Sequence, residues 1–192
     1  MPDASMGDDV VKSKDLALKA QKKILGKMAS KNLTRLLIDD KTAELLDEFG
    51  KVRRDYSSKK DSDKLHHNLI KVMIKVAVLH KNEQFTAAER KLAEKLQSKT
   101  KTTAMTLVSF VEVDFTFDKY VLSKQINEGR AILQQLVANH LTEKSKGRIN
   151  SIFDQIGDTD FLEKLFEPSG PYKESLHKIV ARINDLIEDG IL

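Results

Sequence analysis

The fold is decided by residues 65–79, Leu65-His-His-Asn-Leu-Ile-Lys-Val-Met-Ile-Lys-Val-Ala-Val-Leu79. Apolar residues recur in this stretch at the three- and four-residue spacing of an α-helix, and they fill most of its circumference. Because a helix that is apolar nearly all round is buried among other helices, the stretch predicts the central helix of the protein. Only a narrow polar stripe, which includes Lys71 and Lys75, interrupts the apolar surface.

Capping signals predict where the neighbouring helices begin. Asp39-Asp40 precedes one helix, and Asp61-Ser-Asp63 precedes the central helix. Thr86-Ala-Ala-Glu89 is a capping box, in which the threonine hydroxyl accepts the N3 amide and the glutamate reaches back to the cap. It opens a long helix whose polar stretch, 97–103, is predicted to face solvent or to kink.

The rest of the chain also has helical spacing, and no stretch alternates as a strand would. Later helices are predicted to start at Asp118, Thr142 and Asp158, and the last to end at Gly190, a C′ glycine. The prediction is therefore an all-α protein of six or seven antiparallel helices. Residues 12–192 form one domain, and residues 1–11 are predicted to be disordered.

Residues 12–31 are predicted to form a basic amphipathic helix. The segment holds seven lysines and one acid, Asp15, and its apolar residues fall on the opposite half of the helix from most of the lysines. Such a helix can lie on an anionic membrane surface. It can equally be an ordinary domain helix with a solvated lysine face, and the pattern alone favours that alternative.

Composition narrows the class of protein. The 192 residues include no cysteine, so disulfides, thiolate metal sites and a cysteine nucleophile are excluded. The net charge of +4 is concentrated in the first half of the chain. The first residues do not predict a secretory signal, and no apolar run reaches the ~18 residues that a membrane-spanning helix needs. We therefore expect a cytoplasmic protein with at most peripheral membrane contact.

Catalytic, metal and nucleic-acid motifs are missing from the sequence. The five histidines have no metal-ligand spacing, and there is no Gly-rich phosphate loop or nucleophile elbow. Tryptophan is absent and aromatic residues make up 6% of the chain, which disfavours a base-stacking surface for nucleic acid. We expect no enzyme activity, no catalytic residue, no metal, no cofactor and no nucleic-acid partner.

Several blocks of the sequence resemble the tumour-necrosis-factor-alpha-induced protein 8 family, the TIPE proteins. They keep their order and spacing over roughly residues 13–190, and sequence drift together with the lack of cysteine indicates an invertebrate-type member. The blocks are Lys14 to Met28, Leu37 to Glu48, Asn68 to Asn82, Ala104 to Phe117 and His140 to Asp154.

The resemblance implies a fold and a ligand. It implies a helical topology likened to a mirror image of a death effector domain, built around a large apolar cavity that accepts phospholipid tails. Helices 65–80 and 104–111 would line this cavity, although the same residues would equally suit a filled core. The candidate lining residues are Leu69, Val72, Met73, Val76, Leu107, Phe110, Ile126 and Leu133.

The resemblance also implies where a phosphoinositide headgroup binds. The family's basic positions correspond to Lys22, Lys23 and Lys81, with Lys27 and Lys95 as neighbours. Another family basic position aligns with Gln97, which puts headgroup affinity or selectivity in question unless Lys95 or Lys99 substitutes. Lys71 and Lys75 are further candidates for the cavity mouth, or they face solvent.

Two functions therefore remain open from the sequence. In the first, the protein binds and transfers or presents phosphoinositides at the inner plasma membrane, in lipid signalling, apoptosis and immune regulation. In the second, it is a death-effector-like adaptor that binds signalling proteins or small GTPases without lipid transfer. Co-purification with phospholipid would distinguish them.

Overall fold

The computed structural model describes residues 39–113 and 115–192, and every regular element in these ranges is an α-helix. This confirms the all-α prediction, and the seven helices of the described ranges agree with the expected six or seven. The predicted disordered segment 1–11 and the basic helix 12–31 lie outside the described residues. The helices are α3 (Asp40–Tyr56), α4 (Lys59–Lys81), α5 (Ala87–Glu112), α6 (Lys119–Leu136), α7 (Glu143–Ile156), α8 (Thr159–Leu165) and α9 (Lys173–Glu188).

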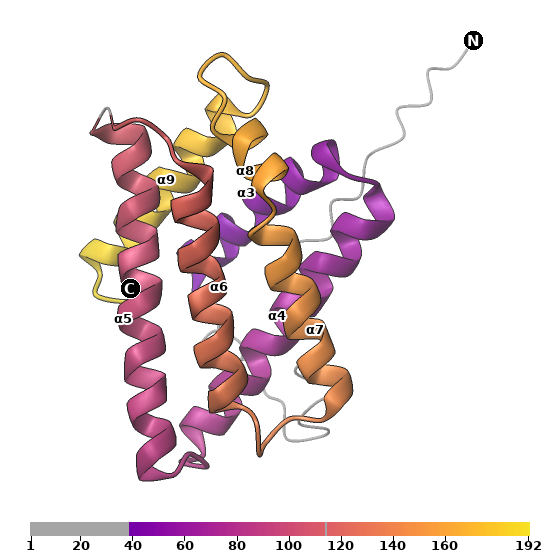
Figure 1. Ribbon diagram of the computed structural model, residues 1–192, viewed down its shortest axis with the longest axis vertical. Coiled ribbons are helices and arrows are strands. Elements are labelled where there is room, and N and C mark those ends of the chain that lie inside the picture. The colour runs from indigo at the N-terminus through magenta and orange to yellow at the C-terminus, as the bar shows by residue number, and fades with distance from the viewer. Residues whose placement is uncertain (1–38, 114) are drawn as a thin grey trace.

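Three pairs of helices pack most extensively, and two of them join helices that are not consecutive in the chain. α5 and α6 lie side by side and antiparallel, α3 packs on α9, and α4 packs on α7 (Figure 1). The central helix α4 supplies two separate core clusters. Leu65 and Val72 pack toward α6 and α7, whereas Ile70 and Ile74 pack toward α3. Its apolar circumference is used on both sides, as the sequence predicts.

Most helix starts follow the predicted caps. Asp39, Asp118 and Asp158 each accept a backbone N–H of the following helix, and Thr86 forms both hydrogen bonds of its capping box. The start of α4 was predicted too late. Ser58 is the N-cap, because its hydroxyl accepts the N–H of Asp61, which places Asp61 inside the first turn.

The polar stretch 97–103 lies inside α5, which continues as one helix to Glu112. Most of its residues are exposed, so the solvent-facing alternative holds. Thr100, Thr102 and Thr103 donate their hydroxyl protons to carbonyls four residues earlier, at 2.9–3.0 Å. These bonds satisfy the hydroxyl protons within the helix itself.

Gly190 ends α9 as predicted and redirects the chain. Its φ of +70° lies in the left-handed region that favours glycine. The N–H of Gly190 donates to the carbonyl of Ile187, and the N–H of Ile191 donates to that of Leu186, which is a Schellman motif. The chain therefore turns back after the helix, and Leu192 packs against the core.

Candidate functional site

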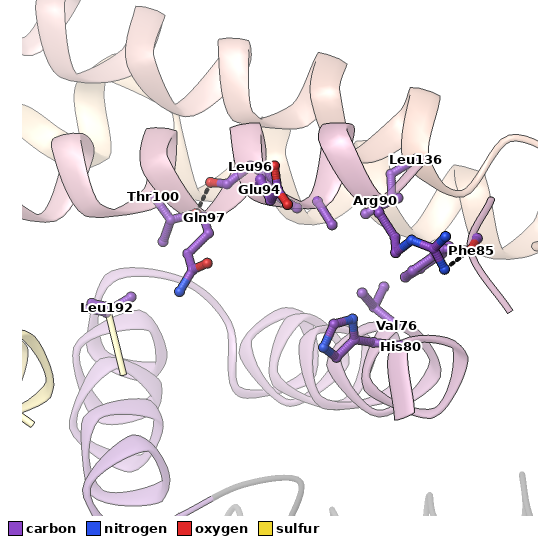
Figure 2. A pocket seen from close by; sticks show the side chains of 11 residues that line it. Val76, His80, Phe85, Arg90, Glu94, Leu96, Gln97, Thr100, Leu136 and Leu192 are labelled. Atoms are coloured by element: carbon purple, nitrogen blue, oxygen red, sulfur yellow. Dashed lines mark hydrogen bonds between the residues drawn. The ribbon is translucent and has the colours of Figure 1, made fainter. Parts of the chain in front are cut away.

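A pocket of about 480 Å³ lies between the last turns of α4 and the first half of α5 (Figure 2). We call it the α4–α5 pocket. Val76 and His80 reach it from α4, and Figure 2 shows them facing Phe85 and Arg90. Its remaining lining residues are Ala93, Glu94, Leu96, Gln97, Thr100, Leu136 and Leu192. The lining is therefore apolar over most of its surface, and its polar side chains come mainly from α5.

A second pocket, of about 340 Å³, lies between α5 and α6. We call it the α5–α6 pocket. Four of its lining residues are polar: Lys99, Thr100, Thr103 and Gln125. The other lining residues are Leu45, Leu96, Ala104, Leu107, Ile126, Gly129, Phe153, Ile156, Ile183, Leu186 and Leu192. Five helices thus contribute to a lining that is predominantly apolar.

The two pockets adjoin, because Leu96, Thr100 and Leu192 line both of them. Leu96 and Thr100 are one helical turn apart on α5, so that face of α5 is a wall common to both spaces. Leu192 reaches the junction because Gly190 turns the chain back after α9. Each pocket is within the ~300–1,000 Å³ range of small-molecule sites.

Several polar groups beside the pockets already have partners. Arg90 Nη1 donates to the carbonyl of Phe85 at 3.3 Å. Lys99 Nζ donates to Glu128 Oε2 at 2.6 Å, which joins α5 to α6. That pairing, first through its hydrogen bond and then through its charge, lowers the pKa of Glu128. Lys99 therefore forms an ion pair that joins α5 to α6.

The predicted cavity residues divide between the pockets and the solid core. Val76 lines the α4–α5 pocket, and Leu107 and Ile126 line the α5–α6 pocket. Val72 and Leu133 are buried in a cluster with Leu136, and Leu69 packs against the same cluster. Met73 packs toward α3, and Phe110 lies in edge-to-face contact with Phe117. Leu69, Val72, Met73, Phe110 and Leu133 therefore belong to the solid core and line neither pocket.

The two predicted headgroup cations that the structure describes, Lys81 and Lys95, do not line the α4–α5 pocket. Lys81 is the exposed last residue of α4, and Lys95 is exposed on α5; neither lines a pocket described above. Gln97, which the resemblance is expected to align with a basic position of the family, lines the α4–α5 pocket. Lys22, Lys23 and Lys27 lie outside the described residues.

Lys75, from the lysine stripe of α4, contacts α7 instead. Lys75 Nζ donates to Ser145 Oγ at 2.7 Å. Burial lowers the pKa of Lys75, and the positive charge of Arg148 lowers it further. Lys71, one turn earlier on the same helix, is half-buried. Neither lysine lines either pocket.

Sequence reasoning missed His80, Arg90, Thr100, Gln125 and Leu192. Arg90 and Gln97 are seven residues apart, which places them on one face of α5. That spacing could have linked Arg90 to Gln97, where a basic position of the family is expected. The contribution of Leu192 had no such signal, because it depends on the packing of α9 beside α5.

Glu89 lies in the first turn of α5, the helix that lines one side of the α4–α5 pocket. Its carboxylate accepts the N–H of Thr86 at 2.9 Å and lies 3.1 Å from His140 Nε2, in the α6–α7 connection. The hydrogen bond from the Thr86 amide, followed by the nearby His140 side chain, lowers the pKa of Glu89 to about 2. The ionised carboxylate therefore ties the first turn of α5 to the far end of α6.

Replacing Glu89 by Gln should lower the free energy of unfolding at neutral pH, and the loss should shrink in acid. The folded-state pKa is about 2 and the unfolded value is 4.5, so the contribution is fully present above pH 4.5. It is lost as the pH falls toward 2. Thermal unfolding of both proteins between pH 7 and pH 2 measures this. A difference that stays constant with pH would contradict the role of the ionised carboxylate.

The described part of the chain lacks two features that would point to other functions. None of its helices is long and apolar enough to cross a membrane. It also contains no group of three or more His, Asp or Glu side chains placed to hold a metal ion.

Comparison with known families matches residues 11–190 to the family described as "Tumor necrosis factor alpha-induced protein 8-like". Tumor necrosis factor alpha-induced protein 8 of Bos taurus is 50% identical over 182 residues, which cover 94% of this chain and 92% of the relative. An insect relative, the tumor necrosis factor alpha-induced protein 8-like protein of Drosophila pseudoobscura pseudoobscura, is 45% identical over 96% of this chain and 99% of its own. The insect relative supports an invertebrate-type member.

A solved structure has a similar fold. It is the crystal structure of the C-terminal region of G-protein interacting protein 1 from Dictyostelium discoideum, with a TM-score of 0.64. The match covers 80% of this chain and 95% of that chain, at 15% sequence identity. At this identity the likeness supports the all-α fold alone.

Proposed function

The chain belongs to the tumor necrosis factor alpha-induced protein 8-like family, and from that premise we propose that it is a non-enzymatic protein that binds a phospholipid or phosphoinositide. Family membership supports a role of the family's kind, in apoptosis and immune regulation. The relatives are named for induction by tumor necrosis factor and not for a catalytic activity. The observation that carries the lipid proposal is the pair of adjoining apolar pockets along α5.

The acyl chains occupy the two pockets in this proposal. Each CH₂ group removed from water contributes about 0.8 kcal/mol, so a protein that carries an acyl chain through water must offer it an apolar lining. The α5–α6 pocket supports this, because five helices contribute predominantly apolar side chains to it. A chain that passes the junction at Leu96 would extend from one pocket into the other.

The anionic headgroup stays at the α4–α5 pocket. Arg90 lines this pocket, and Lys81 and Lys95 are exposed nearby on the two helices that form it. The resemblance adds Lys22, Lys23 and Lys27 from the basic N-terminal segment. Cations near an anionic leaflet contribute about 1 kcal/mol each, so they would also hold the protein on the inner surface of the plasma membrane.

The glutamine at position 97 has a role in this proposal. Its amide lines the α4–α5 pocket where relatives are expected to place a cation. An amide can donate to a phosphate oxygen but adds no charge, so it holds the headgroup more weakly than a cation would. Arg90, on the same face of α5, takes over the charged contact.

Native mass spectrometry of the purified 192-residue chain, followed by lipid extraction, tests the function directly. A phospholipid that co-purifies with the 21.7 kDa protein, or one that binds on addition of a phosphoinositide, would support the proposal. A protein that stays free of lipid under both conditions would contradict it. That result would favour the adaptor alternative. The structural neighbour is a G-protein interacting protein by name, but at 15% identity the likeness carries no argument for such binding by this chain.

Replacing Arg90 by Gln should weaken binding of an anionic lipid about fivefold, which is the loss of one cation near the phosphates. Binding of an uncharged lipid with the same acyl chains should not change. Lys91→Gln is the matched control, because Lys91 is the next residue, is exposed, and lines neither pocket. Equal effects of the two substitutions on vesicle binding would mean that only the overall charge matters.

A further inference from the structure

A further pocket, of about 800 Å³, is formed by the end of α3, the α5–α6 connection and α8 with the residues that follow it. We call it the α8 groove. Its apolar lining is aromatic: Tyr56 is the last residue of α3, and Phe117 and Phe166 stack with their ring centroids 4.2 Å apart. The remaining lining residues are Thr116, Asp160, Glu163, Lys164, Glu167 and Pro168. Figure 1 shows α8 at the opposite end of the bundle from the α4–α5 connection.

Acidic side chains surround the aromatic surface of the α8 groove. Asp160 and Glu163 are three residues apart on α8 and therefore share a face, and Glu167 follows that helix. Residues 158–167 hold four acids and one lysine, although the whole chain has a net charge of +4. The α8 groove is thus an acidic region on a basic protein.

Two lysines offset only part of this negative charge. Lys119 pairs with Glu163 at 2.7 Å, and Lys164 pairs with Glu167 at 3.1 Å. The two glutamate side chains remain 65% and 45% exposed, so a further cation can approach each of them. Asp160 is exposed and takes part in no ion pair within the described ranges. A basic segment would therefore complement the groove.

The connection that supplies Thr116 and Phe117 also exposes apolar side chains to water. Phe115 is 60% exposed and Tyr120 is 69% exposed. Large exposed aromatic side chains in a segment that lines a groove are typical of an interaction surface. The nearby carboxylates disfavour an anionic membrane as the partner, because the two surfaces would repel each other.

We propose that the α8 groove binds the basic amphipathic segment 12–31 of the same chain. That segment holds seven lysines and one acid, and its apolar half needs an apolar surface whenever it does not lie on a membrane. The aromatic rings of the groove supply this surface, and the carboxylates receive the lysines.

The connecting chain is long enough for this contact. Lys31 and Asp39 are separated by eight residue steps, which span about 26–29 Å when extended. The 17 residues of α3 make a helix about 26 Å long, with Asp39 before its first residue and Tyr56 at its end. The chain before Asp39 can therefore follow α3 to the groove. A tethered segment also acts at an effective concentration that a separate peptide seldom reaches.

Docking in the α8 groove regulates membrane binding, a consequence that rests on the proposed lipid-binding function. Lysines that are paired with groove carboxylates are not available to an anionic leaflet. The groove and the membrane therefore compete for segment 12–31, and each shifts the population of the chain away from the other.

The docking itself is tested by cross-linking the 192-residue chain with a water-soluble carbodiimide, which joins an amine to a carboxylate where the two touch. Digestion and mass spectrometry identify the linked residues. Lysines of segment 12–31 should link to Asp160, Glu163 or Glu167. Glu143 is the reference carboxylate, because its side chain is 89% exposed and lies on α7 outside the groove. Salt at about 1 M should reduce the groove links, since the Debye length is then about 3 Å.

Groove links that are more abundant than links to Glu143, in monomers separated by size, would support the docking. Equal linking to Glu143 would overturn it, because the segment would then meet every exposed carboxylate alike. Groove links found only in dimers would also overturn it, because the occupant would be a second copy of the chain.

The competition with the membrane has its own measurement, with vesicles of phosphatidylcholine and phosphatidylserine. Asp160→Asn combined with Glu167→Gln removes two groove carboxylates and should tighten vesicle binding about fivefold, because lysines are released from the groove. Glu143→Gln combined with Glu174→Gln is the matched control, since it removes the same charge from exposed positions on α7 and α9. The control should stay within about twofold of the unaltered chain.

Equal gains in the two double variants would overturn the competition, because overall charge would then account for the effect. Melting temperatures that match the unaltered chain exclude unfolding as the cause of tighter binding. Absence of vesicle binding by every variant would contradict the proposed function, and the cross-links would then decide the docking by themselves.

Discussion

Thr100→Trp should abolish lipid binding while the protein remains folded. Thr100 lines both pockets from the wall that they share. It is exposed to solvent, so a larger side chain can be accommodated there without displacing the core. An indole at this position would gain more by burial in the adjoining apolar pockets than by exposure to water. It would fill the junction through which an acyl chain passes. We expect at least a tenfold loss of co-purified or added lipid.

The matched control is Thr102→Trp. Thr102 is also exposed on α5, donates its hydroxyl proton to a carbonyl four residues earlier, and lines neither pocket. Lipid binding should be retained in this variant. The comparison separates an effect of filling the pockets from an effect of tryptophan on the helix itself.

Fluorescence gives an independent measurement of where the indole lies. The natural sequence has no tryptophan, so all indole emission comes from the introduced residue. Emission should be at shorter wavelength for Thr100→Trp than for Thr102→Trp, since the first indole is buried in an apolar space. A short-wavelength emission together with full lipid binding would mean that the ligand lies elsewhere.

The sequence predicts those parts of the structure that depend on local chemistry. The capping box of Thr86 and Glu89 and the C′ glycine at Gly190 were predictable, because each motif involves residues within a few positions of one another. Even here the start of α4 was misplaced, because Ser58 and Asp61 are both good capping residues and only the backbone decides between them.

The pockets depend on which helices meet, and periodicity along one helix does not contain that information. Leu96, Leu136 and Leu192 are far apart in the chain, and they line one space only because α5 packs beside α6 and α9. The same limit applies to Lys75. Its position on a polar stripe left solvent and the cavity mouth as alternatives, whereas its partner is Ser145 on α7.

Of all the substitutions proposed for this chain, Phe161→Ala should cause the largest fall in the free energy of unfolding. The Phe161 ring on α8 is 1% exposed and contacts Phe49 and Tyr56 edge-on, with centroid distances of 6.1 and 5.1 Å. Removing a buried phenylalanine side chain costs about 3–5 kcal/mol. The upper part of that range is expected because Phe161 also covers the buried guanidinium of Arg53. A protein of this size should lose about 8–20 °C of melting temperature.

The contribution of Arg53 to that loss can be measured separately. Arg53 is 5% exposed, and its Nε and Nη1 have no hydrogen-bond partner, while Nη2 donates to Gln155 at 3.3 Å. Burial lowers the pKa of Arg53, although nearby tyrosines and aspartates oppose the shift. The Phe161 ring therefore supplies the main favourable contact for a poorly solvated cation, through its negatively polarised face.

A double-mutant cycle with Phe161→Leu and Arg53→Met measures this contact. Leucine keeps most of the apolar volume but removes the aromatic face, and methionine keeps the side-chain length but removes the charge. We expect a coupling of about 1–2 kcal/mol in urea unfolding, because Phe161→Leu should be far less costly once the cation is gone. Additive effects would show that Phe161 acts through packing alone. Lipid binding should be unchanged in both single variants, since neither residue lines a pocket beside α5.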